Sequence, residues 1–230
     1  KAKILILEHL LAGTSRDQIV TMQDALVNFV EEQSTKRKFI SYGFSRLDGR
    51  LYSDYGDFVV LAGRPSAGKT AMALQMAVHM GRHDKVGFYS LETSPAKLTN
   101  RIIANRAIVD FGRINRREMT QEEWERVVRL KGEIMESDVE LIPASGWSVQ
   151  DILSTALQRR HKIIFIDYLQ QLTGRGKDRF EQVTRISLDL HAMAQTHGIL
   201  VVALSQLNRA STARPDAAPT LTDLRESGQI

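Results

Sequence analysis

The sequence contains no cysteine and no long apolar run, and both absences narrow its class. Without cysteine, neither a disulfide framework nor a thiolate metal site can form. Apolar stretches such as residues 4–7 are far shorter than the roughly 20 residues that a membrane-spanning helix needs, and no signal-peptide pattern precedes them. We therefore expect a protein that does not enter a membrane, and a reducing, cytoplasmic setting is compatible with the composition.

The remaining composition is typical of a globular protein, with 43% hydrophobic and 25% charged residues. A chain of 230 residues is long enough for one domain, or for one domain with an appendage. The net charge of +4 favours a polyanionic partner only mildly. Because the sequence begins with Lys rather than Met, we expect it to be part of a longer protein.

The strongest motif is an eight-residue glycine-rich segment that fits G-x-x-x-x-G-K-[ST], between a predicted strand at residues 58–62 and a predicted helix. In this context the backbone N–H groups converge on one anion, and the helix N-terminus adds partial positive charge. Lys69 would reach the β- and γ-phosphates, and the Thr70 hydroxyl would bind Mg²⁺. The motif predicts a nucleoside triphosphatase or a kinase. Its residues are Gly63, Arg64, Pro65, Ser66, Ala67, Gly68, Lys69 and Thr70.

The first 38 residues are predicted to form an appendage. Apolar residues recur at helical spacing from Ser15 to about Gln33, with Ser15 and Gln18 placed as a capping box. This pattern predicts an amphipathic helix, followed by a polar break at residues 34–38. The helix could pack on its own domain or dock on a neighbouring subunit or an upstream domain, and the pattern leaves both alternatives open.

Beyond the appendage, wholly apolar strands alternate with helices, which indicates an α/β fold with a mostly parallel sheet covered on both faces. Strands are predicted at residues 58–62, 86–91, 139–142, 163–167 and 199–204. Helices are predicted after the glycine-rich segment, from Pro95 with Ser94 as cap, and at residues 121–136, 148–160 and 178–197. A basic helix and loop should carry Arg101, Arg106, Arg113, Arg116 and Arg117.

Polar residues follow three of these strands, at the edge where ligands bind in such sheets. Asp167 ends an apolar strand, the arrangement in which an aspartate supports the magnesium shell. Because the next residue, Tyr168, is not an acid, the base that activates water must come from elsewhere. Glu92 is the candidate, although it could instead be a surface residue near Ser94. Gln206 could sense the γ-phosphate or orient water, or could be a simple strand-end residue.

Two further sequence patterns do not indicate a functional site. His79 and His83 are four residues apart, but no glutamate lies between them and Gly81 interrupts the helix, so a zinc site is not expected. Trp124 is predicted to lie in the core rather than to form a base-stacking platform, together with Val127, Val128 and Ile134.

Several of these segments, in order and spacing, resemble the RecA-like ATPase domain of DnaB-type replicative DNA helicases. They are the glycine-rich segment, residues 89–92, 166–170 and 205–209, and the terminal residues 221–228, of which the last are the most specific. The resemblance covers about residues 40–230. It implies a ring hexamer that hydrolyses ATP with Mg²⁺ at subunit interfaces and translocates along single-stranded DNA, with a primase and a helicase loader as partners.

The resemblance also implies roles for single residues. Lys69 and Thr70 would bind phosphate and magnesium, Asp167 would support the metal, Glu92 would be the general base, and Gln206 would report the γ-phosphate. Arg101 would lie near the nucleotide. Arg225, Glu226 and Gly228 match the segment that follows the DNA backbone in the ring channel. The loops at residues 173–179 and 208–220 would face the same channel and grip phosphates through Arg175, Lys177, Arg179, Arg209 and Arg214.

The resemblance divides the chain into a docking-helix region, residues 1–38, and an ATPase domain, residues 39–230. The family continues past the position of Ile230 with residues that complete a neighbour's ATP site, so no arginine finger is assigned. One alternative is a RecA- or KaiC-like ATPase acting as a recombinase or a nucleotide-gated switch without unwinding. Another is a small-molecule kinase, which would need an arginine lid over a second pocket.

Overall fold

The computed structural model describes residues 20–33 and 38–207. The chain separates into two units, Lys1–Phe39 and Ile40–Ile230. Along the described residues, no helix combines the length and apolarity needed to cross a membrane.

In the first unit, helix α2 spans Met22–Gln33. Thr21 caps it, because its Oγ1 accepts a hydrogen bond from the Asp24 N–H at 3.1 Å. The predicted continuous helix from Ser15 is therefore wrong, since Thr21 supplies a cap within the stretch; Ser15 and Gln18 themselves lie outside the described residues. The apolar face of α2 is exposed, with Met22 at 86%, Leu26 at 62% and Phe29 at 55%.

The second unit is built on five parallel strands in the order β1-β5-β4-β2-β3, which confirms the predicted α/β fold. The strands are β1 Phe58–Gly63, β2 Val86–Ser90, β3 Val139–Pro143, β4 Ile163–Asp167 and β5 Leu200–Gln206. β2 ends two residues before Glu92, earlier than predicted, but the Leu91 N–H still donates to the Asp167 carbonyl at 2.9 Å. The chain leading to Glu92 is thus held beside β4.

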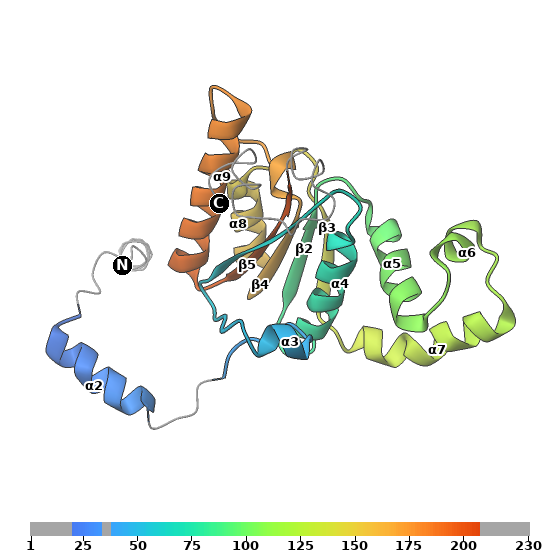
Figure 1. The fold of residues 1–230 in the computed structure, drawn as a ribbon, viewed down its shortest axis with the longest axis horizontal. Helices are drawn as coiled ribbons and strands as arrows, with labels where there is room; N and C mark the ends of the chain where they lie inside the picture. Colours follow the sequence, from blue (N-terminus) through green and yellow to red (C-terminus); the bar gives the residue numbers. More distant parts are fainter. Residues whose placement is uncertain (1–19, 34–37, 208–230) are drawn as a thin grey trace, which may run out of the picture. The chain divides into compact units, whose positions relative to one another are not determined.

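Helices cover both faces of the sheet (Figure 1). In β4, Ile163 and Phe165 pack in the cluster with α4 Lys69–Met80, whereas Ile164 and Ile166 pack in the cluster with α8 Val149–Arg159 and α9 Arg179–His197. This alternation is the period of two that a strand imposes, and it explains why β4 is apolar throughout. Two further short elements of this unit are α3 Ser45–Asp48 and the 3-10 turn η1 Leu169–Gln171.

A small lobe at one side of the sheet contains α5 Pro95–Ala107, α6 Phe111–Arg116 and α7 Gln121–Met135. The predicted helix at residues 121–136 is confirmed as α7, and Thr120 and Glu123 form a capping box at its start. The segment predicted as a basic loop is partly helical, because Asp110 caps α6 by accepting from the Arg113 N–H at 2.9 Å. The core prediction for Trp124 and Val128 is wrong, since they are 52% and 54% exposed. The lobe core buries mainly the other stripe of α7.

A polar network joins the segments near the amino ends of β2, β3 and β4. The Glu140 carboxylate accepts from Arg159 at 2.8 Å and pairs with Lys85 at 3.0 Å. His161 Nε2 lies 3.0 Å from Glu140, and Nδ1 lies 3.0 Å from the Tyr89 hydroxyl. Because a carboxylate only accepts, Nε2 carries the proton and Nδ1 accepts from Tyr89. Burial lowers the pKa of His161, and the Arg159 hydrogen bond is the main cause that holds the pKa of Glu140 far below its usual value.

Candidate functional site

The glycine-rich segment forms a loop between β1 and α4. Two of its residues have left-handed backbone, Ser66 at φ 60° and Gly68 at φ 88°, and the Ala67 N–H donates to the Arg64 carbonyl at 3.2 Å. Gly68 is the N-cap of α4, whose first N–H groups have no acceptor within the helix. The loop therefore presents the end of a helix and its partial positive charge, the geometry that favours a phosphate.

Lys69 lies folded across the start of this loop. Its Nζ donates to the carbonyl oxygens of Gly63 and Arg64, both at 3.0 Å. A Cβ on residue 63 would lie 3.2 Å from the Lys69 Cγ, so glycine at this position gives the lysine stem room. Desolvation lowers the pKa of Lys69, and the charge of Asp167 opposes that shift. The ammonium is thus held at the loop, where an anion would compete with two neutral carbonyls for it.

Asp167 is where the predicted site residues meet. It ends β4 and is only 7% exposed. Burial raises the pKa of Asp167, whereas a hydrogen bond from the Thr70 side chain and the charges of Arg101 and Lys69 lower it; the charge of Glu92 raises it. Residues from α4, α5 and the segment after β2 therefore act on one buried carboxylate at the end of β4. The Thr70 hydroxyl and the Asp167 carboxylate are hard oxygen donors, the type that magnesium prefers.

Glu92 and Arg101 lie on the segment that follows β2. The Glu92 side chain is exposed, so its carboxylate is accessible to water. Arg101, on α5, is half-buried, and its guanidinium carbon lies 6.0 Å from the centre of the Phe111 ring. An exposed acid and a positioned cation, both close enough to influence Asp167, suit an edge at which charged phosphates are bound.

Gln206 ends β5, as predicted, and pairs in register with Gly63 of β1. A neighbour that the sequence reasoning gave no role, Gln170 in η1, holds this strand end. Its Nε2 donates to the Ser205 hydroxyl at 2.9 Å and to the Gln206 carbonyl at 3.2 Å, and its Oε1 accepts from the Gln206 N–H at 3.4 Å. The only sequence signal for this role is its place three residues after Asp167.

His79 of the histidine pair contacts Ser41 and His83. His79 Nε2 lies 3.0 Å from the Ser41 hydroxyl, and its ring meets His83 edge-on with centres 6.2 Å apart. Throughout residues 20–33 and 38–207, no three histidine, cysteine, aspartate or glutamate side chains cluster as metal ligands. The magnesium prediction at Thr70 and Asp167 involves a different kind of site, with oxygen donors supplied in part by the nucleotide.

The predicted DNA-contacting residues Arg225, Glu226 and Gly228 lie outside the described residues, as do Arg209, Arg214 and the loop at residues 208–220. The loop at residues 173–179 is described. The Arg179 side chain is exposed, and its guanidinium donates to the Gln170 carbonyl and, at 3.1 Å, to Gln182.

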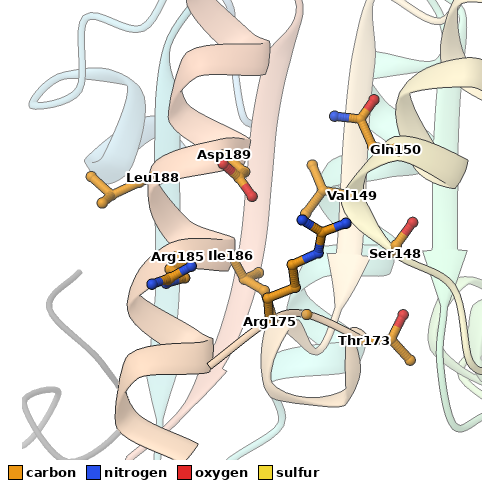
Figure 2. A pocket seen from close by; sticks show the side chains of 10 residues that line it. Ser148, Val149, Gln150, Thr173, Arg175, Arg185, Ile186, Leu188 and Asp189 are labelled. Carbon is orange, nitrogen blue, oxygen red and sulfur yellow. The ribbon is translucent and has the colours of Figure 1, made fainter. Parts of the chain in front are cut away.

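A cavity of about 630 Å³ lies between this loop, the start of α8 and α9. Arg175 extends into it from the loop, and Arg185 and Asp189 border it from α9 (Figure 2). Arg185 is paired with Glu181 at 2.6 Å, and Asp189 adds a second acid. Since the charges of both signs nearly cancel, the cavity itself is not a strong phosphate site.

Comparisons with known proteins agree with this geometry. The replicative DNA helicase DnaB of Rickettsia typhi is 34% identical over 210 residues, which cover 83% of this chain and 42% of that protein. The chain thus spans less than half the length of this relative. A solved ATPase domain aligns with a TM-score of 0.82 at 36% identity, over 91% of this chain and 79% of that one.

A second structure, of a DnaB-like replicative helicase described with its interactions with primase, aligns with a TM-score of 0.80 at 34% identity. It covers 99% of this chain and 58% of that one. The family of DnaB-like helicase C-terminal domains matches residues 40–230. The chain therefore belongs to the family of DnaB-like helicase C-terminal domains.

Proposed function

We propose that this chain is the ATP-hydrolysing motor domain of a replicative DNA helicase. The observation that carries the proposal is the convergence on Asp167 of the Thr70 hydroxyl and the charges of Lys69, Arg101 and Glu92. An edge of a parallel sheet that combines a phosphate loop, a buried acid and an exposed acid is suited to phosphoanhydride hydrolysis. Membership of the helicase family supplies the biological setting.

The substrate would be ATP bound with Mg²⁺. Thr70 and Asp167 would hold the metal, and the phosphate loop with Lys69 and Arg101 would hold the phosphates. Both oxygen donors lie together already, and the buried Asp167 carboxylate gains from any cation that offsets its desolvation. When bound, the metal would neutralise part of the charge on the phosphates.

The chain's own residues would divide the chemistry among them. Lys69 would exchange its two carbonyl acceptors for phosphate oxygens, which bind an ammonium more strongly because they are charged. Glu92 would accept the proton of the attacking water, and a positioned base of this kind contributes about 10²–10⁴-fold in rate. The Gln206 amide would contact the γ-phosphate or orient the water.

In the whole protein, we propose that the domain at residues 39–230 works in a ring hexamer on single-stranded DNA, in the cytoplasm, with a primase and a loader as partners. Arg225, Glu226 and Gly228 would follow the DNA backbone. Residues 1–38 would form a docking region. The exposed apolar face of α2 supports this role, because a short amphipathic helix gains its stability from packing.

The alternative of a recombinase or nucleotide-gated switch is not favoured, because the matching family and the named relatives are replicative helicases. It predicts filaments, or nucleotide-gated binding of a partner, without strand separation. A small-molecule kinase is disfavoured on the same ground.

The test uses the full-length protein with Glu92→Gln. ATP binding should stay within about twofold of wild type, whereas turnover should fall by about 100-fold or more, because the amide cannot take a proton. The matched control is Glu122→Gln, which changes an exposed carboxylate outside the site, on α7. This variant should hydrolyse ATP at the wild-type rate. Surviving hydrolysis in Glu92→Gln would assign the base to another residue.

The motor itself is tested by adding single-stranded DNA. Turnover should rise severalfold with DNA and be lost in Lys69→Ala, which removes the ammonium from the loop. Turnover that is indifferent to nucleic acid would refute the helicase assignment even if Glu92 acts as the base.

A further inference from the structure

Gln170 occupies a place that the sheet leaves open. The ladder between β4 and β5 ends at the pair Ile166 and Ala203, whereas β5 continues to Gln206 beside β1. The last residues of β5 therefore have a β1 partner on one side but no β4 partner on the other. The Gln170 side chain fills that place, because its amide both donates to the Gln206 carbonyl and accepts from the Gln206 N–H.

Gln206 is consequently held from two sides. On one side it is in register with Gly63, whose carbonyl accepts from the Leu207 N–H at 3.2 Å and from Lys69 Nζ at 3.0 Å. On the other side the Gln170 amide makes the two backbone hydrogen bonds that a neighbouring strand would make, and it also donates to the Ser205 hydroxyl. A peptide fixed on both edges fixes the direction in which its side chain leaves the backbone.

Gln170 is itself anchored. Its carbonyl accepts from the guanidinium of Arg179, the first residue of α9, and Arg179 closes the loop that carries Arg175 into the cavity of Figure 2. The other end of that loop is tied down by the Thr173 N–H, which donates to the Trp147 carbonyl at 2.9 Å. η1 is thus fixed between the strand end and α9, so Gln170 is a rigid support.

We propose that Gln170 is the positioning residue of the ATP site: it fixes the backbone of Gln206 so that the Gln206 amide is aimed at the γ-phosphate. The inference rests on the proposed function, and it assigns Gln170 no contact with the nucleotide. A positioning role predicts a loss in turnover with little change in ATP binding, since the phosphate loop and Asp167 make the binding contacts.

The test is Gln170→Glu, a nearly isosteric change that replaces the donating nitrogen with an oxygen facing the Gln206 carbonyl. In the full-length protein with single-stranded DNA, kcat should fall about tenfold or more while KM for ATP stays within about twofold. The matched control is Gln171→Glu. Gln171 is the next residue of η1, is exposed and donates to the Tyr168 hydroxyl at 2.7 Å rather than to β5, so kcat should not change. A urea unfolding curve for each variant verifies that it folds.

Two further variants separate the outcomes. Ser205→Ala removes one of the Gln170 contacts and should reduce kcat much less than Gln170→Glu does. Gln206→Ala should lower kcat. Adding Gln170→Glu to Gln206→Ala should cause no further loss, because Gln170 has no side-chain amide left to position once Gln206 is alanine.

An impaired Gln206→Ala beside a normal Gln170→Glu would overturn the positioning role and leave the proposed function intact. Losses that multiply in the double variant, or a raised KM at normal kcat, would also overturn it. A fully active Gln206→Ala would refute the role proposed for Gln206 and, with it, the need for a support.

Discussion

Gly87 in β2 has no room for a side chain, and replacing it tests the packing beneath the site. A Cβ built on residue 87 would lie 2.5 Å from His161 Nδ1, 2.7 Å from His161 Cε1 and 2.8 Å from Tyr89 Cε2. The His161 side chain cannot move aside easily, because it is fully buried and is held by both Glu140 and Tyr89. Gly87→Ala must therefore displace the imidazole and break the bond to Tyr89.

Overpacking of this kind costs about 1–3 kcal/mol, and a lost buried hydrogen bond about 1 kcal/mol. The gain from replacing glycine within a strand, about 0.5–1 kcal/mol, offsets part of this. We expect Gly87→Ala to lose about 2 kcal/mol of unfolding free energy, which in urea lowers the midpoint by about 1 M. Equilibrium unfolding followed by far-UV circular dichroism measures the change.

Gly132→Ala is the matched control, because nothing lies within 4 Å of a Cβ at that position in α7. It should be neutral or should stabilise by up to about 1 kcal/mol through helix propensity. A Gly87→Ala variant within about 0.5 kcal/mol of wild type would refute the reasoning, since it would mean that His161 is free to move.

Two further predictions concern the same network and the first unit. The pKa of His161 is lower in the folded protein than in the unfolded chain, so the unfolded chain binds a proton first as the pH falls below about 6.5. The free energy of unfolding should therefore fall by up to about 1.4 kcal/mol per pH unit until the folded-state pKa is reached. Urea unfolding between pH 7.5 and 5 measures this slope, and His161→Gln should flatten it. The double variant Leu26→Asp/Phe29→Asp should break the proposed hexamer into smaller species, as measured by sedimentation velocity. The control Asn28→Asp lies on the opposite side of α2 and should leave the hexamer intact. A hexamer that survives the double variant would contradict docking through the apolar face.

The fold was predictable because its strands are buried on both faces and its helices carry strong end signals. Ile163 to Ile166 are apolar throughout, which indicates a parallel sheet, and Thr120 and Gly198 mark helix ends by their chemistry. The errors arose where tertiary context decides. Trp124 has the spacing of a core residue, but the lobe core packs on the stripe of α7 that carries Val127 and Leu130. Helical spacing also did not mark Thr21 as the cap of α2, because a cap is set by its side-chain hydrogen bond and not by apolar spacing.

The site was predictable to the extent that its residues lie at strand ends. Asp167 and Gln206 end their strands as expected, because the carboxyl ends of parallel strands meet at one edge. Gln170 could not have been given its role, since the contact joins residues 35 and 36 positions apart through a side chain that completes a ladder. Whether β4 would end short of β5 is a matter of register, which the sequence does not show.

The same register links Lys69 with the end of β5. The Gly63 carbonyl accepts from Lys69 Nζ and from the Leu207 N–H, the residue after Gln206. A phosphate that recruits the ammonium removes one of these two donors, so the remaining bond to Leu207 no longer shares its acceptor. If the loop binds a nucleotide as proposed, that binding would act on the β5 terminus through one carbonyl oxygen, while Gln170 holds that terminus from the other side. The phosphate loop and the end of β5 that carries Gln206 are therefore coupled through the Gly63 carbonyl. A substitution in either segment should be tested for its effect on both Lys69 and Gln206.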